Sequence, residues 1–466
     1  MPTTDLATPL PRPRGLGIVH GLQLARDPLG FLARAREQCG DTFGIQMPGD
    51  PLRVVTGDPE HVKTIFGLPS DCYRMSNQAI PLNLGDGSLL FLDGARHQRI
   101  HRLLMPPLHG EHLRSYAELI SRATDDAIDR FTTERPFSLL PAMKWITLTV
   151  ICECVLGAHE GERIEFLRDR VGRWMAGPMS TLAFSLGMML GAGRVRAFFD
   201  RQTAHSPVTR GRRPGRWRLP WQRVGDAKAD LISMLREDFE ACRRRSDPCR
   251  LDVLALLSAA RDETGAPMET DDAIDQLLTM LVGGYESAAN TLAWTVHHLL
   301  DHPDHVLRLR EETAALTHQR ERRPWTDACI AEALRLHPIA PVVNRELTRA
   351  VRLGDRDIPE GTILWPSIYL AHTHPGTWSE PYRYDPARML DRRPRANEWL
   401  PFGGGKRRCI GAAFAEMEMR IVLGRLLERV DLRPGADRRS HAILRGVTVS
   451  PDDGVRVVAD RVRPRS

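Results

Sequence analysis

Three glycines followed by a cysteine, near the C-terminal end, constrain this chain more than any other feature. The segment Phe402–Gly411 reads FGGGKRRCIG, and an apolar helix is predicted directly after it, over about residues 412–430. Consecutive glycines let a backbone approach another group closely. A cysteine at the mouth of a helix lies beside free N–H groups and a partial positive charge, which stabilise a thiolate. Cys409 is therefore a candidate ligand for a soft metal, and its hydrogen bonds would tune that metal.

Spacing weakens several other interpretations of Cys409. A zinc site would need further Cys or His ligands at zinc-site spacing, and the sequence has none there. A phosphate-binding loop needs Gly-Lys followed by Ser or Thr, whereas Lys406 is followed by Arg407. A cysteine nucleophile would need a histidine base, and this interpretation stays open. A single cysteine also suits haem, because the porphyrin supplies four other iron ligands.

The same ten residues resemble the haem-binding signature of the cytochrome P-450 family, in particular its soluble bacterial-type haem-thiolate monooxygenases. The matching positions are Phe402, Gly403, Gly405, Arg407, Cys409 and Gly411. The resemblance implies haem b (iron protoporphyrin IX) as the cofactor and Cys409 as the axial iron ligand, whose electron donation favours O–O cleavage. It also implies that Arg407 pairs with a haem propionate and that Phe402 packs beside the sulfur.

A second matching motif is Glu332-Ala333-Leu334-Arg335, in which an acid and a base lie three residues apart on a predicted helix. Taken alone, this would be an ordinary surface pair worth roughly 0.2–0.5 kcal/mol. The family has the same pair together with a third partner, which Arg388 matches. The resemblance implies that Glu332, Arg335 and Arg388 form a buried structural trio that anchors the loop before the cysteine. Met389 departs from the family, where an aromatic residue usually follows the arginine.

A third motif, Gly283-Gly284-Tyr285-Glu286-Ser287, interrupts a long apolar helix. Glycines in mid-helix cost about 1 kcal/mol each relative to alanine, so a packing notch with a snorkelling glutamate is one interpretation. By the resemblance, Gly283 and Gly284 form an oxygen-binding groove, and Glu286 and Ser287 are the acid–alcohol pair that relays protons. Ser287 stands where threonine is usual and lacks the methyl group that fixes the rotamer. We therefore expect less tight coupling of oxygen reduction to product formation.

The basic segment at residues 97–102 carries a fourth match. Its two histidines lie four residues apart, but a zinc-protease pair is excluded because glutamine stands where that motif needs glutamate. The family has a basic residue at each position to hold haem propionates. His97 matches, whereas His101 stands where arginine is more usual, so Arg99 or Arg102 could take its place. Arg345 resembles a further propionate ligand. A solvated side chain is the alternative for each of them.

Periodicity predicts a mainly α-helical chain with a smaller β region. The clearest helical patterns lie at residues 115–130, 143–156, 227–244, 270–300 and 412–430, and strands are predicted at 42–47, 52–56, 351–353, 363–365, 442–449 and 455–459. Because strands from both chain ends would share a sheet, we expect a single domain over residues 1–466. It includes a Pro/Arg-rich arm at 1–20 and an irregular basic insertion at 206–223. The resemblance implies the cytochrome P-450 fold, with haem between the long central helix and the helix after the cysteine loop.

Composition limits the class of protein. Hydrophobic residues make up 42% and charged residues 27%, an ordinary globular balance. No apolar run reaches 18 residues and no signal peptide is visible, so we expect no membrane anchor. Eight cysteines without a CxxC pair are typical of a reduced, cytoplasmic protein. A net charge of +6 could suggest nucleic acid, but no nucleic-acid motif accompanies it; a solvated surface or a docking face for an acidic protein fits better.

The resemblance implies a monomeric enzyme that hydroxylates or epoxidises a hydrophobic small molecule such as a terpene, fatty acid or steroid. No flavin or nicotinamide motif appears, so electrons are expected from a ferredoxin- or flavodoxin-type donor that docks near Lys406, Arg407 and Arg408. By analogy with the family, the substrate pocket would be lined by residues 79–92, 174–190, 278–284, 339–343 and 446–448.

Two other haem functions stay open from the sequence. A haem-thiolate enzyme that uses peroxide, or isomerises a hydroperoxide, would need no reductase. Such proteins tend to lack the acid–alcohol pair, so Glu286 and Ser287 argue against this alternative. A non-catalytic haem sensor or carrier would consume no oxygen with any reductant and substrate.

Overall fold

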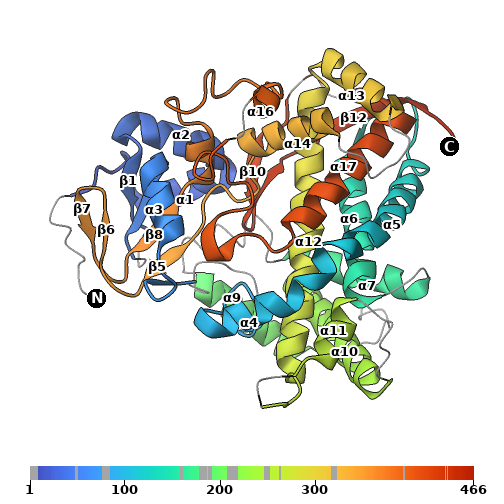
Figure 1. Ribbon diagram of the computed structural model, residues 1–466, viewed down its shortest axis with the longest axis horizontal. Coiled ribbons are helices and arrows are strands. Elements are labelled where there is room, and N and C mark those ends of the chain that lie inside the picture. Colours follow the sequence, from blue (N-terminus) through green and yellow to red (C-terminus); the bar gives the residue numbers. More distant parts are fainter. Residues whose placement is uncertain are drawn as a thin grey trace.

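Helices form most of the molecule, and the largest sheet lies to one side of them in the computed structural model (Figure 1). The structure describes residues 9–47, 51–75, 84–157, 161–177, 186, 192–206, 219–245, 252–261, 264–315, 323–391, 394–435, 437 and 439–465. Within these ranges no helix combines the length and the apolar character needed to cross a bilayer.

The helices of the described part follow one another along the whole chain. They are α1 (Gly17–Arg26), α2 (Pro28–Cys39), α3 (Pro59–Gly67), α4 (Gly94–Leu104), α5 (Glu111–Ile128), α6 (Leu140–Leu156), α7 (Glu162–Ala176), α9 (Ala192–Ala204), α10 (Pro220–Arg245), α11 (Val253–Ala259), α12 (Thr270–Leu299), α13 (Pro303–Ala315), α14 (Pro324–Leu336), α15 (Ile368–His372), α16 (Arg388–Asp391) and α17 (Ala412–Arg429). Two short 3-10 turns add to them, η2 (Pro106–Leu108) and η3 (Gly405–Arg407).

The largest sheet combines strands from two distant parts of the chain. Its order is β1 (Thr42–Ile45), β2 (Arg53–Thr56), β8 (Ile363–Pro366), β5 (Arg345–Leu347) and β3 (Tyr73–Arg74). Strands β2 and β8 run parallel, and the other neighbours run antiparallel. The smaller sheets are β4 (Phe137–Ser138) with β12 (Arg456–Val462) and β9 (Val430–Pro434), the hairpin β6 (Val351–Leu353) with β7 (Arg356–Ile358), and the hairpin β10 (Ala442–Arg445) with β11 (Thr448–Pro451).

The long helix α12 crosses the middle of the molecule and is buried along most of its length (Figure 1). Its most extensive contact is with α6, which is apolar all around, as expected for a helix enclosed by protein. Gly284 lets the two helices approach closely, because a Cβ there would lie 2.6 Å from the Ile151 Cδ1 atom. The helix after the cysteine loop, α17, packs against both α12 and α5.

A capping residue fixes where α3 begins, and α3 in turn supports the cysteine loop. Asp58 precedes Pro59, and its carboxylate accepts hydrogen bonds from the amides of Glu60 and His61, both at 2.9 Å. An aspartate at the N-cap satisfies amides that have no partner inside the helix, and proline suits the first helical position.

The predicted architecture, mainly helical with small sheets, is confirmed. The strand pair predicted at 42–47 and 52–56 forms β1 and β2, and the largest sheet indeed joins strands from both parts of the chain. The single strand predicted at 442–449 is wrong. The chain reverses at Gly446, whose φ of 60° favours glycine, so this segment contributes to a hairpin.

Two boundaries also differ from the prediction. Helix α1 begins at Gly17, inside the segment predicted as an arm, and α10 begins at Pro220, inside the predicted irregular insertion. Proline is well tolerated in the first turn of a helix, so Pro220 is compatible with the start of α10. Residues 1–8 and 207–218 lie outside the described part of the chain.

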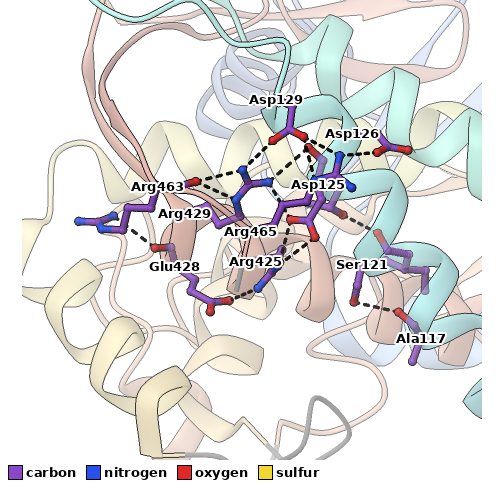
Figure 2. A network of polar contacts seen from close by, with 12 residues as sticks. Ala117, Ser121, Asp125, Asp126, Asp129, Arg425, Glu428, Arg429, Arg463 and Arg465 are labelled. Carbon is purple, nitrogen blue, oxygen red and sulfur yellow. Dashed lines mark hydrogen bonds and ion pairs between the residues drawn. The ribbon is translucent and has the colours of Figure 1, made fainter.

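A network of ion pairs fastens the C-terminal end of the chain to α5 (Figure 2). Arg429, the last residue of α17, is 3% exposed and donates to Asp125 Oδ1 at 2.9 Å and to Asp129 Oδ1 at 2.6 Å. Its Nε also donates to the Arg463 carbonyl at 3.1 Å. Arg465 joins the cluster through Asp129 at 2.8 Å. The network therefore holds the far end of the helix that begins after the cysteine loop.

We predict that Arg429→Met lowers the free energy of unfolding by about 3 kcal/mol, because removing one partner of a buried ion network leaves charge poorly compensated. The shift in the urea midpoint, followed by circular dichroism, measures this loss. Arg433→Met is the matched control, since its side chain is 55% exposed and pairs with Asp460. Equal midpoints for the two variants would contradict a stabilising role for the network.

Candidate functional site

The cysteine loop folds back on itself at the beginning of α17. The Cys409 amide donates to the Phe402 carbonyl at 2.9 Å, and Gly411 directly precedes the first turn of α17. Gly403 turns the chain between them with a φ of 67°, a backbone conformation that favours glycine. The Cys409 side chain is exposed. The loop therefore presents a thiol beside a helix N-terminus, as the sequence predicts.

Opposing effects act on the Cys409 thiol. Burial among the surrounding residues raises its pKa, whereas the Gly411 amide, which donates to the sulfur, and the charge of Arg408 lower it. The pKa is raised on balance, so a bound metal cation would be needed to hold the thiolate form.

The two glycines after Gly403 bring the loop against α3. A Cβ on Gly405, whose φ is 62°, would overlap the Phe66 carbonyl oxygen, and a Cβ on Gly404 would lie 3.1 Å from the Phe66 ring. The close approach predicted from the glycines therefore has an identified neighbour, the last turn of α3.

Four basic side chains from three elements lie close together near the loop: His97 and His101 of α4, Arg345 of β5 and Arg407 of η3. Burial, and then the charges of its three neighbours, lowers the pKa of His97 to about 4. Burial and the charges of His109 and Arg407 lower the pKa of His101. The cluster is thus short of negative charge.

Arg345 shows this shortage most clearly. Its side chain belongs to a residue that is 3% exposed, and its Nε has no hydrogen-bond partner in the described structure. One guanidinium nitrogen donates to the Asn344 carbonyl at 2.8 Å, and the group lies 4.8 Å from the centre of the Tyr73 ring. Burial lowers its pKa. Among the described residues, no carboxylate forms an ion pair with this buried cation.

Arg407 is tied to the start of α4. Its guanidinium forms an ion pair with Asp93 and also donates to the Leu92 carbonyl. The pair joins the cysteine loop to the helix that carries the two histidines, although the residues are 314 positions apart. Sequence reasoning missed Asp93, because a single aspartate before a helix looks like an ordinary cap.

A strip of α12 lacks the protein cover that its neighbours have. Gly283 is exposed and Ser287 half-buried, whereas Leu281, Val282 and Tyr285 are buried. A Cβ on Gly283 would meet no atom within 4 Å. The Ser287 hydroxyl donates to the Gly283 carbonyl at 2.8 Å. Since this strip lies in the middle of a buried helix, it is available to a bound group.

The Glu286 side chain contacts α6 and β11 and not the uncovered strip of α12. Its carboxylate forms an ion pair with Lys144 of α6, and its other oxygen accepts a hydrogen bond from Thr448 at 3.4 Å. Consecutive residues of a helix do not face the same direction. No hydrogen bond joins Glu286 to Ser287 in the described part of the chain. Lys144 was missed from the sequence, although its charge in the apolar segment 140–152 was a usable signal.

The predicted structural residues meet where α14 and α16 pack together. Arg335 grips the Glu332 carboxylate with two nitrogens, at 2.7 and 2.8 Å, and Arg388 Nε lies 3.1 Å from the same carboxylate. Both Glu332 and Arg335 are fully buried. Arg335 also donates to the carbonyls of His372 at 2.8 Å and Pro381 at 2.6 Å. The trio thus ties α14 to the segment that leads toward the cysteine loop.

These features fit a haem. An exposed cysteine at a helix N-terminus can hold the iron, and an uncovered strip of α12 leaves space for a flat group. A basic cluster, in which the buried Arg345 Nε has no hydrogen-bond partner among the described residues, suits the two propionates. The family model described as Cytochrome P450 matches residues 9–455. The chain belongs to the cytochrome P-450 family.

Relatives and solved structures agree with this. A Mycobacterium tuberculosis H37Rv protein named cytochrome P-450 135B1 is 32% identical over 462 residues, 98% of this chain and 92% of its own length. Cytochrome P-450 138 from the same strain is 31% identical and covers 97% and 96%. Retinoic acid bound cyanobacterial CYP120A1 superposes with a TM-score of 0.81, at 21% identity, over 98% of this chain and 100% of its own. The predicted cytochrome P-450 fold is confirmed, and the chain is a haem-thiolate monooxygenase.

Some substrate-lining segments predicted by analogy lie outside the described residues of this P-450. These are residues 79–83, 178–185 and 187–190. Of the apolar residues in the described remainder, Leu89 and Phe91 are buried and Val342 is half-buried. Gly446 and Thr448 lie at the turn and edge of the β10–β11 hairpin, where Thr448 contacts Glu286.

We predict that Arg345→Met speeds loss of haem from this P-450 by roughly 10- to 100-fold, because a hydrogen bond to a charged group contributes about 1.5–3 kcal/mol. Transfer of haem to an excess of apomyoglobin measures the rate. The haem-free protein should keep or gain stability, since the substitution removes a buried cation that forms no ion pair within the described part of the chain.

Arg349→Met is the control for that experiment. Arg349 is near in sequence, but its side chain is 55% exposed and pairs with Asp71. If both variants released haem at the wild-type rate, Arg345 would not hold a propionate.

Proposed function

We propose that this P-450 inserts one atom of O2 into a hydrophobic small molecule, with haem b as cofactor and electrons from a separate, acidic ferredoxin or flavodoxin. The observation that carries the proposal is the pairing of an open thiol at Cys409 with an uncovered strip at Gly283 and Ser287. When bound, the haem supplies oxygen activation, while the protein supplies the thiolate, the proton path and the pose of the substrate.

The substrate class is inferred to be apolar: a terpene, a fatty acid or a steroid-like molecule. Open glycine surface in an otherwise apolar helix gives an apolar substrate close access to the reacting centre. One protein of the same fold, CYP120A1, holds retinoic acid, which is a largely apolar isoprenoid.

Four residues are assigned to holding the propionates: His97, His101, Arg345 and Arg407. Their mutual repulsion favours binding of two carboxylates, because each neighbouring cation already penalises the charged form of His97. Cys409 is assigned as the iron ligand, with Phe402, Gly403 and Gly411 shaping its loop.

The electron donor would dock on the side of the cysteine loop. Lys406 and Arg408 are exposed there, and Arg102 of α4 is exposed as well. The Arg407–Asp93 ion pair holds that helix against the loop. An acidic partner would be attracted to these cations, and its association should weaken as salt rises. We place the enzyme in the cytoplasm as a monomer.

Glu286 and Ser287 are assigned to proton delivery. Ser287 Oγ lies on the uncovered strip and holds its proton toward the Gly283 carbonyl, so its lone pairs can receive a proton from another donor. Glu286, buried next to it in sequence, is the nearest acid along the helix. The serine hydroxyl lacks the methyl group that would restrict its rotation.

We predict that the fraction of consumed O2 recovered as hydroxylated product rises in the order Ser287→Ala, wild type, Ser287→Thr. Alanine removes the hydroxyl, and threonine keeps it while restricting its rotamer. Product carrying 18O from 18O2, and hydrogen peroxide released, are measured with an acidic ferredoxin, its reductase and a ligand found by spectral shift. Thr295→Ala is the control, because among the described residues its buried hydroxyl bonds only the Thr291 carbonyl, at 2.8 Å.

Turnover with peroxide but none with any ferredoxin or flavodoxin would overturn the proposal in favour of a peroxide-dependent enzyme. The absence of oxygen consumption with all reductants and ligands would favour a sensor or carrier instead.

A further inference from the structure

A cavity of about 400 Å³ lies between α6, α7, α12 and the C-terminal hairpin β10–β11. Its lining includes Trp145 of α6, Arg168 of α7, Tyr285 of α12 and Arg445 of β10. Neither Cys409 nor the basic cluster that would hold the propionates borders it. The cavity has the size of a small-molecule site, and a molecule in it would not occupy the haem site.

Two arginines of the cavity wall, Arg168 and Arg445, form no ion pair within the described part of the chain. Arg168 donates a hydrogen bond to the Thr149 hydroxyl at 3.0 Å, and its guanidinium group lies 4.7 Å from the centre of the Trp145 ring. Burial lowers the pKa of Arg168. The group is therefore held in place at the cavity, while none of the described carboxylates pairs with its charge.

Arg445 has unused hydrogen-bonding capacity at the cavity. One of its terminal nitrogens donates to the Asp452 carbonyl at 3.2 Å, whereas its Nε atom is buried and has no hydrogen-bond partner among the described residues. A buried N–H group without a partner costs free energy, so an acceptor that reaches it is bound favourably. A carboxylate supplies two oxygens in the geometry that matches a guanidinium group.

The other charged groups that line the cavity already have partners. Lys144 forms an ion pair with Glu286. The carboxylates of Asp452 and Asp453 accept hydrogen bonds from backbone amides, at 2.9 and 3.0 Å. These two carboxylates would repel a second negative charge on a ligand. The cavity therefore favours a monoanion over a dianion such as phosphate.

The remaining wall of the cavity suits an apolar group. Leu140 and Leu148 of α6 and Tyr285 of α12 border the cavity, and all three are buried. Apolar atoms of a ligand gain free energy there when they leave water. The two arginines come from other elements, α7 and β10, so apolar and cationic walls enclose the same space. This combination favours an amphipathic ligand.

We propose that this cavity binds a small organic monocarboxylate, whose carboxylate is held by Arg168 and Arg445 and whose apolar part packs against α6 and α12. The site goes beyond the proposed function, because it needs neither iron nor oxygen. Its ligand would connect α7 to the β10–β11 hairpin, since each of these elements supplies one arginine.

The first test compares three ligands of similar shape and different charge. Isothermal titration calorimetry is carried out on the ferric holoenzyme with 4-phenylimidazole bound to the iron, so that the substrate pocket is occupied. 2-Naphthoate should bind at one site, about 10- to 100-fold more tightly than 2-naphthalenemethanol, because it makes charge-assisted hydrogen bonds. The 2-naphthylmethylammonium ion should bind more weakly than the alcohol. Equal or tighter binding of the alcohol or the ammonium ion would overturn the proposal, as would the absence of naphthoate binding.

The second test locates the site. Arg445→Met and Arg168→Met should each weaken binding of 2-naphthoate about 10- to 100-fold and leave the affinity for 2-naphthalenemethanol near that of the wild type. Arg173→Met is the matched control, because Arg173 also lies on α7, has a side chain that is 49% exposed, pairs with Asp169 and does not line the cavity. Unchanged naphthoate affinity in both arginine variants would contradict the assignment of the site.

A third variant fills the cavity without removing a charge. Gly172 of α7 borders the cavity, and a Cβ there would meet no atom within 4 Å. Gly172→Phe should therefore abolish binding of the naphthoate and of the alcohol, while the Soret band and its response to 4-phenylimidazole stay as in the wild type. Naphthoate binding that survives in Gly172→Phe would place the ligand elsewhere and overturn the inference.

Discussion

One backbone hydrogen bond, from the Cys409 amide to the Phe402 carbonyl at 2.9 Å, closes the loop on which the site depends. It is possible because Gly403 and Gly405 adopt left-handed backbone conformations that other residues rarely adopt. The closed loop sets Cys409 just before the first turn of α17 and leaves this residue exposed. The ion network at the far end of α17 and the buried Glu332–Arg335 pair hold this geometry from both sides.

The site gives up stability for function in two places. Arg345 is buried without a carboxylate partner among the described residues, and burial, together with the cationic neighbours, lowers the pKa of His97 to about 4. Such groups are costly alone and become favourable only when an anion binds among them. Gly283 likewise leaves the middle of α12 uncovered, which favours binding of a group that covers it. These departures from good packing are typical of a binding site for a large, doubly charged group.

Local patterns predicted the cysteine loop and most of the long helices, because each depends on residues close in sequence or on strong periodicity. The buried trio of Glu332, Arg335 and Arg388 was predicted from the family resemblance, since the local pattern alone would suit a surface pair. Periodicity could not reveal the partner of Glu286, since Lys144 lies 142 residues away and the pair forms only when α6 packs on α12. Arg407 was predicted to hold a propionate. Its ion pair with Asp93 was not predicted, because these two residues are also far apart in the sequence. Gly284 was assigned to an oxygen groove, but its missing side chain accommodates Ile151, as a packing notch would.

The coordination of iron by Cys409 is tested most directly by the absorption spectrum of the reduced protein under carbon monoxide. Thiolate ligation predicts a Soret band strongly shifted to the red of that given by a histidine-ligated haem, and loss of this band in Cys409→Ser. A band at the histidine-ligated position, or an unchanged spectrum in Cys409→Ser, would contradict the assignment of this sulfur and, with it, the account of the whole site.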